Sequence, residues 1–241
     1  MATFEQALVI VPTYNESDNI HPMIEKLFGL YPQISVLIID DNSPDGTAQI
    51  VTSLQQRFPN LYLLQRAGKL GLGTAYITGF KWALERKFEF IFEMDCDFSH
   101  DPQELQNFLE AIESADLVIG SRYINGIRIC NWSMGRLLLS YCASIYVRLV
   151  TGIPVEDTTG GFKCFRRKVL EGLNFKKIQS NGYSFQIELN YLTWAKGYRV
   201  KEIPITFYER RLGESKMGKN IVFEALFMVV KLRIKNLLGI L

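Results

Sequence analysis

Residues 88–101 read FEFIFEMDCDFSHD, an apolar stretch that runs directly into a cluster of acidic side chains. The mostly aromatic run at 88–92 is typical of a buried strand. Asp95 and Asp97 follow it at once, and two close carboxylates raise each other's pKa unless a cation or hydrogen bonds stabilise their charges. The segment therefore predicts a strand that ends in a divalent metal site, in an acidic solvent-exposed loop or at a helix N-terminus.

A short apolar stretch followed by a helical pattern recurs along the first half of the chain. Runs that predict strands lie at residues 7–12, 34–40, 61–66, 88–95 and 116–122. Helical spacing of apolar residues follows at 17–31, 48–58, 71–86 and 102–114. Near-continuous apolar strands that alternate with helices are typical of a parallel sheet with helices on both faces. We therefore predict an α/β fold with a mostly parallel central sheet.

Polar segments close four of these predicted strands. They are TYNE (13–16), DDNSPDG (40–46), DCDFSHD (95–101) and SR (121–122). Ligands of parallel sheets bind at the carboxyl ends of the strands, which meet at one edge. The sequence therefore predicts a polar binding site at that edge.

The second half of the chain is less regular. Residues 131–152 and 182–197 have the spacing of helices, and 158–173 indicate a glycine turn, a short strand and a helix. Two extended segments at 198–211 precede a loop at 213–219. We predict one domain over residues 1–220 and a C-terminal amphipathic helix over 221–241, which packs on the core or lies at a membrane interface.

Composition narrows the classes of function. Apolar residues make up 48% of the 241 residues and charged residues 22%, as in ordinary soluble globular proteins. A net charge of +2 gives no reason to expect a nucleic-acid partner. Two histidines and four cysteines without CxxC pairing argue against a zinc site. Scattered thiols fit a reducing compartment.

Membrane and export signals are weak. The N-terminal sequence MATFEQALVIVPTYNE lacks a basic n-region and a long apolar h-region, so no signal peptide is expected. The apolar stretches at 137–147 and 221–230 are too short to span a bilayer. The predicted helix at 131–152, which includes Trp132, and residues 219–241 could each lie in the membrane interface, pack on the core or contact another subunit. We expect a soluble or peripheral protein.

The acidic pair has a definite metal preference. Asp95 and Asp97 offer oxygen ligands with few nitrogen or sulfur atoms nearby, which favours Mg²⁺ or Mn²⁺. Such ions use one or two carboxylates and complete their shell with water and substrate phosphates. Arginine binds phosphate in a bidentate manner, and Arg122, at the end of the fifth strand, is one candidate. Arg136 and Ser140, four residues apart, share one face of a helix.

Two further segments leave alternatives open. Asp40 and Asp41 could accept hydrogen bonds from a base or a ribose, whereas the residues after them are typical of a turn and a helix cap. KLGLGTAY (69–76) lacks the GK[ST] of a P-loop and the spacing of a dinucleotide fingerprint. Its Gly71 and Gly73 either meet an anion or allow close helix packing.

Several motifs together resemble one enzyme family. They are VPTYNE (11–16), IIDDNSPDGT (38–47), KLGLGTAY (69–76), MDCDFSHDP (94–102), GSRY (120–123), TGGFKCFRR (159–167), GYSFQIE (182–188) and ERRLGESKMG (209–218). In this order they resemble the dolichyl-phosphate (polyprenyl-phosphate) mannosyltransferases of glycosyltransferase family 2. The resemblance implies the GT-A fold and a metal-dependent, inverting transfer of mannose from GDP-mannose to the phosphate of a polyprenyl lipid.

The resemblance also implies roles for individual residues. Asp95 and Asp97 would bind Mg²⁺ or Mn²⁺. Nucleotide-sugar binding would involve Pro12, Tyr14, Glu16, Ile39, Asp41, Asp95, Cys96, Asp97, Arg122, Arg210 and Lys216. Arg122, Arg136 and Ser140 would contact the acceptor phosphate, and Asp97, Arg122 and Arg210 would be catalytic. The enzyme would act peripherally on the cytoplasmic face of the membrane, with a membrane-anchoring partner or a second subunit as further options.

A phosphate acceptor suits this residue set. Its second pKa lies near ~6, so it is largely ionised at neutral pH and needs no general base. The site instead needs cations that bring two anions together and stabilise the leaving diphosphate. A sister enzyme that uses UDP-glucose or another nucleotide-sugar is the nearest alternative. A fold that binds nucleotide without catalysis is a second alternative, but the acidic pair and the basic residues are intact.

Overall fold

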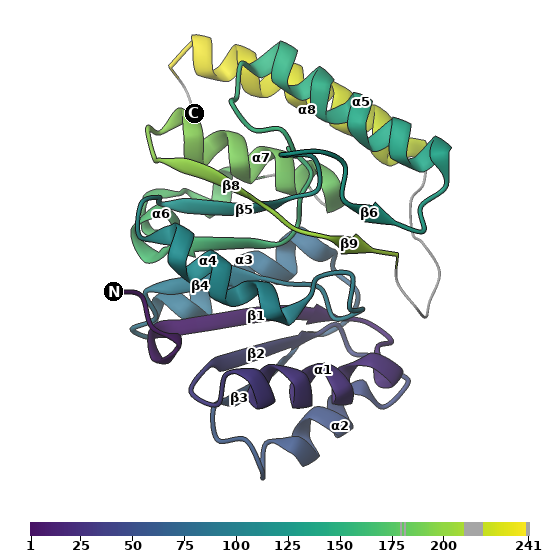
Figure 1. Cartoon of the computed structure of the whole chain (residues 1–241), viewed down its shortest axis with the longest axis vertical. Coiled ribbons are helices and arrows are strands. Elements are labelled where there is room, and N and C mark those ends of the chain that lie inside the picture. The colour runs from purple at the N-terminus through teal and green to yellow at the C-terminus, as the bar shows by residue number, and fades with distance from the viewer. Residues whose placement is uncertain (179, 181, 210–218, 240–241) are drawn as a thin grey trace.

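The structure of the chain is a computed structural model that describes residues 1–178, 180, 182–209 and 219–239 (Figure 1). Its centre is a seven-stranded sheet in the order β3-β2-β1-β4-β7-β5-β8. The strands are β1 (Ala7–Thr13), β2 (Ser35–Asp40), β3 (Leu61–Gln65), β4 (Phe90–Glu93), β5 (Leu117–Ser121), β7 (Lys163–Arg166) and β8 (Val200–Pro204). All five strands predicted in the first half are present, and the α/β fold class is confirmed.

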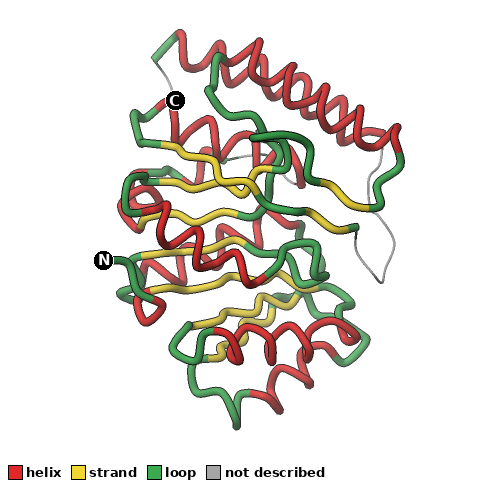
Figure 2. Tube along the Cα trace, in the orientation of Figure 1, coloured by secondary structure: helices red, strands yellow, loops and turns green. Residues whose placement is uncertain are grey.

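Helices alternate with these strands, as the periodicity predicts (Figure 2). The α-helices are α1 (Ser17–Leu30), α2 (Thr47–Leu54), α3 (Leu72–Leu84), α4 (Leu105–Ile112), α5 (Met134–Thr151), α6 (Arg167–Gly172), α7 (Gly182–Ala195) and α8 (Lys219–Leu237). Short 3₁₀ helices are η1 (Phe4–Gln6), η2 (Pro102–Glu104) and η3 (Phe175–Lys177). Helix α5 begins later than predicted because Ser133 caps it by accepting a hydrogen bond from the Arg136 N–H.

The sheet is parallel except at one strand. Strand β7 runs antiparallel between β4 and β5. The segment that contains α5 leaves the sheet at the carboxyl end of β5 and returns to it at the same edge, so β7 runs in the opposite direction. Strand β7 thereby brings Lys163 opposite Glu93 of β4.

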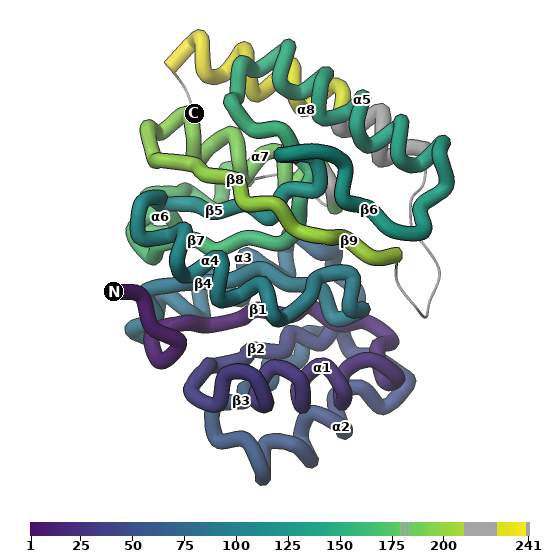
Figure 3. Tube along the Cα trace, in the orientation of Figure 1, coloured from purple at the N-terminus to yellow at the C-terminus, as the bar shows by residue number. Residues whose placement is uncertain are grey.

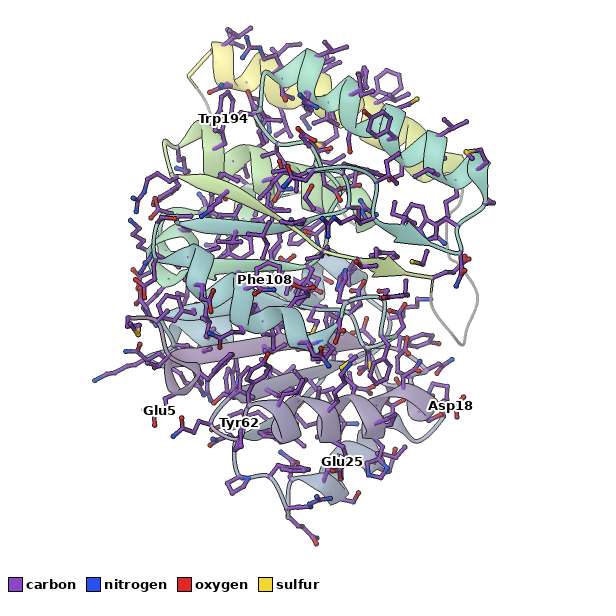
Figure 4. All side chains as sticks on the ribbon, viewed as in Figure 1. Glu5, Asp18, Glu25, Tyr62, Phe108 and Trp194 are labelled. Carbon is purple, nitrogen blue, oxygen red and sulfur yellow. The ribbon has the colours of Figure 1, made fainter. Side chains whose placement is uncertain are left out.

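Two apolar cores cover the two faces of the sheet. One joins the sheet to α1, α2 and α4, and Phe108 of α4 packs there against Phe92 and Phe162 (Figure 4). The other joins it to α3, α6 and α7 and includes Val147 of α5 and Val229 of α8. Burial on both faces explains why the strands are nearly continuous apolar runs.

A second, two-stranded sheet lies beyond the main one. It pairs β6 (Ile129–Cys130) with β9 (Phe207–Tyr208) in parallel. The extended character of β9 was predicted, but β6 was not, because two residues are too few to carry a periodic signal. This small sheet joins the segment before α5 to the segment after β8.

Helices α5 and α8 lie side by side at the end of the molecule opposite β3 (Figure 3). The Tyr146 hydroxyl of α5 donates to the Leu226 carbonyl of α8 at 3.1 Å, and Asn236 donates to the Tyr191 hydroxyl of α7 at 2.9 Å. The C-terminal helix thus packs on the core. The predicted boundary at residue 221 stays a prediction. Among the described residues, no helix has the length and apolar character needed to cross a bilayer.

Candidate functional site

A cavity of about 340 Å³ opens at the carboxyl edge of the parallel strands, where the sequence predicts the site. Its wall includes nine of the predicted site residues, which come from segments far apart in the chain: Pro12, Tyr14, Glu16, Asp41, Asp95, Cys96, Asp97, Arg122 and Arg136. Ile39 is instead buried in the core that faces α3, and Ser140 does not line the cavity. Arg210 and Lys216 lie outside the described residues.

The two aspartates after β2 have different surroundings. Asp40 is turned into the fold, where its carboxylate accepts from the Thr13 hydroxyl at 3.0 Å and from the Ser43 N–H and hydroxyl at 2.9 and 2.6 Å. Asp41 lines the cavity and forms a bidentate pair with Arg66 at 2.5 and 2.7 Å. Of the two, Asp41 is therefore the one that can meet a ligand.

Arg66 also holds the glycine-rich segment beside the cavity. It donates to the Thr74 hydroxyl at 2.7 Å and to the Gly71 carbonyl at 3.2 Å. The Lys69 ammonium lies 4.5 Å from the centre of the Tyr14 ring. Gly73 serves helix packing, because a Cβ there would lie 2.7 Å from the ring of Phe185. Gly71 lines the cavity, so anion binding at Gly71 stays a prediction.

Asp95 and Asp97 lie together at the end of β4. The side chain of Asp97 is nearly buried, with 6% of the residue exposed, and its Oδ1 accepts from the Ser99 N–H at 3.1 Å. Burial raises the pKa of Tyr76 well above its usual value, and the nearby carboxylates of Asp95, Glu93 and Asp97 raise it further. Negative charge is thus concentrated at this end of the cavity.

The donor set fits a hard divalent ion. Two carboxylates from one strand end face a cavity that can also admit a phosphate. Among the described residues, no cluster of three or more histidine, cysteine, aspartate or glutamate side chains could form a complete metal site. A metal bound here would therefore complete its shell with water and substrate oxygens.

His100 is a site residue that sequence reasoning missed. Its Nδ1 accepts from the Asp95 N–H at 3.1 Å, and its ring stacks on Phe162 with centroids 4.8 Å apart. Burial lowers the pKa of His100 to about 4, although Asp97 acts in the opposite direction. The ring is therefore neutral at pH 7 and fixes the turn that carries the acidic pair.

Arg122 is held by a carboxylate that the sequence did not single out. Its Nε and Nη2 each donate to Asp157 at 2.6 Å, and Nη2 also donates to the Thr159 hydroxyl at 2.7 Å. Burial alone would raise the pKa of Asp157, but the charge and hydrogen bonds of Arg122 lower it below its usual value. The guanidinium lies between the rings of Tyr123, Trp132 and Phe207, 5.4 to 5.5 Å from each centroid.

Arg136 and Ser140 lie on the α5 side of the site. Arg136 stacks over Trp132 at 4.0 Å and donates to the Glu209 carboxylate at 3.0 Å. Ser140 accepts a hydrogen bond from the Tyr123 hydroxyl at 2.7 Å. Only Arg136 of the two reaches the cavity wall. The sequence allowed Trp132 to lie in the membrane interface or to pack on the protein, and its contacts with Arg122 and Arg136 could not be predicted from spacing along the chain.

Sequence comparisons show which known proteins this chain is similar to. Residues 8–173 match the family described as Glycosyl transferase family 2. A polyprenol monophosphomannose synthase of Mycolicibacterium smegmatis is 42% identical over 96% of this chain and 88% of its own length. An undecaprenyl-phosphate mannosyltransferase of Micrococcus luteus is 42% identical over 94% of this chain and 93% of its own.

Solved structures with low sequence identity share the fold. A mannosyltransferase of Pyrobaculum calidifontis in complex with GDP-Man and Mn²⁺ has a TM-score of 0.58 and 18% identity, over 97% of this chain and 74% of that one. A glucosyl-3-phosphoglycerate synthase of Mycobacterium tuberculosis, in complex with Mn²⁺, UDP-glucose and phosphoglyceric acid, has a TM-score of 0.67 and 15% identity, over 94% and 79%.

Proposed function

Because the chain belongs to glycosyl transferase family 2, we propose that it transfers mannose from GDP-mannose to the phosphate of a polyprenyl phosphate, with inversion at the anomeric carbon. The observation that carries the proposal is the 42% identity, over nearly the whole chain, to the polyprenol monophosphomannose synthase and the undecaprenyl-phosphate mannosyltransferase. The cavity supports it, since its wall combines the acidic pair with arginines.

The nucleotide would lie at the end of the cavity formed by β1 and β2. Asp41 is fixed there by Arg66, and Tyr14 lies under the Lys69 ammonium. A carboxylate and an aromatic ring suit the hydrogen-bonding edge and the face of a base or ribose. The diphosphate would then extend toward Asp95 and Asp97.

Asp95 and Asp97 would hold Mg²⁺ or Mn²⁺ against the diphosphate. When bound, a divalent ion neutralises charge that develops on the departing diphosphate. The protein's part is to hold both carboxylates in place. The Ser99 N–H fixes Asp97, and the His100 ring fixes the backbone of Asp95.

Arginines would bring the acceptor phosphate to the anomeric carbon. Arg136 lies on the α5 side of the cavity, and its partner Glu209 is partly exposed, so an incoming phosphate can compete for it. Arg122 lies deeper, with its orientation fixed by Asp157. The lipid phosphate is already an anionic nucleophile, so no group of the protein has to remove a proton from it.

The lipid would reach this site along helices α5 and α8. Both carry exposed apolar side chains along their lengths: Met134, Leu138, Leu139, Tyr141, Ile145, Leu149, Leu226, Phe227, Val230, Ile234 and Leu237. Arg136 is on α5 itself, which connects this apolar surface to the cavity. The enzyme would thus contact the cytoplasmic face of the membrane peripherally.

The test is a transfer assay with purified protein. Labelled GDP-mannose is incubated with polyprenyl phosphate in detergent, and product is measured in the lipid phase. We expect mannosyl polyprenyl phosphate, with no product from labelled UDP-glucose under the same conditions. Transfer from UDP-glucose alone would refute the assigned donor and favour the sister activity.

A further inference from the structure

A buried ion pair lies directly under the acidic end of the cavity. Glu93 of β4 and Lys163 of β7 are register partners, both fully buried, with Nζ and Oε2 4.0 Å apart. Among the described residues, neither carboxylate oxygen of Glu93 has a hydrogen-bond partner of normal geometry. An interior ion pair of this kind costs desolvation energy, so its presence next to a site calls for a functional explanation.

Gln186 of α7 connects this pair to the cavity. Its side-chain oxygen accepts a hydrogen bond from the Lys163 ammonium, which also donates to the Gln186 carbonyl at 3.3 Å. An ammonium group has only donors, so the carboxamide must turn its oxygen toward Lys163 and its NH₂ group away. The residue is 3% exposed, and that small exposed part belongs to the cavity wall.

The NH₂ group of Gln186 lies beside Gly161. A Cβ on Gly161 would lie 3.8 Å from the Gln186 Nε2 and 3.6 Å from His100 Cε1. All three residues line the cavity. The absence of a side chain at 161 thus leaves room beside a carboxamide whose orientation is fixed. Glu93 lies close enough to interact with the same amide, but the NH₂ group has two hydrogens and one can serve the cavity.

We infer that the Gln186 carboxamide donates a hydrogen bond to a hydroxyl oxygen of the transferred sugar, in the space beside Gly161. This inference rests on the proposed function, which supplies the sugar. In the proposed function the base lies at Tyr14 and Asp41 and the acceptor phosphate at Arg136, and these positions leave the wall formed by Gln186 for the sugar. A neutral amide suits a neutral hydroxyl, because the charge of Lys163 is already balanced by Glu93.

Glu93 and Lys163 are positioning residues in this scheme. They do not line the cavity, and their effect on the ligand passes through the orientation of Gln186. A fixed donor loses no rotamer entropy when the sugar binds, which is how a buried ion pair can improve recognition.

The experiment compares ligands with and without the sugar. Affinities of the wild type, Gln186→Ala and Gly161→Ala for GDP and for GDP-mannose are measured by calorimetry in the presence of Mn²⁺. Gln186→Ala should lower the affinity for GDP-mannose by about tenfold, the effect of one hydrogen bond, and change the affinity for GDP by less than about twofold. Gln106→Ala, on the exposed face of α4, is the matched control and should change neither.

Gly161→Ala tests the same space without touching the buried pair. Its Cβ would make ordinary van der Waals contacts, so the variant should fold even if Gln186→Ala does not. We expect Gly161→Ala to lower the affinity for GDP-mannose at least about fivefold and to leave the affinity for GDP unchanged. Equal losses for GDP and GDP-mannose in the variants would overturn the inference, and so would unchanged affinities.

The transfer assay separates this inference from the proposed function. If the wild type does not transfer mannose, the proposed function fails. If the wild type transfers mannose but Gln186→Ala keeps the KM for GDP-mannose, only the inference fails. An effect confined to the KM for lipid phosphate would assign Gln186 to the acceptor and likewise refute a sugar contact.

Discussion

Replacement of Asp157 by asparagine isolates the contribution of the buried ion pair that holds Arg122. Asp157 is fully buried and Arg122 is 5% exposed, and three donors of Arg122 bond to this carboxylate. Asparagine keeps the shape of the side chain but removes the charge and offers an NH₂ group where an acceptor is needed. A buried guanidinium without its counter-ion destabilises a protein by about 3–5 kcal/mol.

The assay is urea denaturation and thermal unfolding of both proteins at pH 7. At about 2–4 °C per kcal/mol for a domain of this size, the melting temperature should fall by about 10 °C. Asp18→Asn, an exposed carboxylate in the first turn of α1, is the matched control and should cost less than about 1 kcal/mol. A loss below about 1 kcal/mol for Asp157→Asn would refute the argument that Arg122 depends on this partner.

Three further predictions concern the Asp157 carboxylate, the metal site and the packing of helix α3. The pKa of Asp157 is lowered in the folded state, so its carboxylate contributes fully to the free energy of unfolding above about pH 4, and this contribution disappears as the pH falls through the lowered pKa. The difference in melting temperature between the wild type and Asp157→Asn should therefore be smaller at pH 3 than at pH 7. An equal difference at the two pH values would contradict this reasoning. Asp97→Ala should abolish mannosyl transfer while circular dichroism and the melting temperature stay close to the wild type; full activity in a buffer with Mn²⁺ would remove Asp97 from the metal site. Gly73→Ala should destabilise the fold by about 1–3 kcal/mol, because its Cβ would lie 2.7 Å from Phe185. Gly135→Ala, also in a helix but with open space around it, is the control and should be neutral or stabilising. Equal effects of the two substitutions in urea denaturation would argue against close packing at Gly73.

The parallel strands of the first half and the helices between them could be predicted from the sequence. Strands β1, β2, β4 and β5 are buried on both faces, so their apolar composition and the helical spacing between them indicated the parallel sheet. That Asp41, Asp95 and Arg122 lie together at one edge of the sheet could also be predicted, because the carboxyl ends of parallel strands meet at one edge. Strand β6 and the antiparallel direction of β7 did not follow, since both depend on where the chain returns after α5.

The partners of the site residues were the part that sequence could not supply. Arg122 was found as the cation at a strand end, but Asp157 lies 35 residues later and carries no local signal. The link between Lys163 and Gln186 joins β7 to α7, and it exists only once both elements pack on the sheet. The family resemblance implied that Ile39 binds the nucleotide-sugar, yet its side chain lies in the core.

Metal dependence of the transfer reaction is the most direct test of the central claim. The protein is stripped with a chelator, and mannosyl transfer to polyprenyl phosphate is measured before and after Mg²⁺ or Mn²⁺ is restored. If Asp95 and Asp97 hold the ion against the departing diphosphate, the stripped enzyme should be inactive and the added ion should restore its rate. A stripped enzyme that transfers mannose as fast as the restored one would contradict the account.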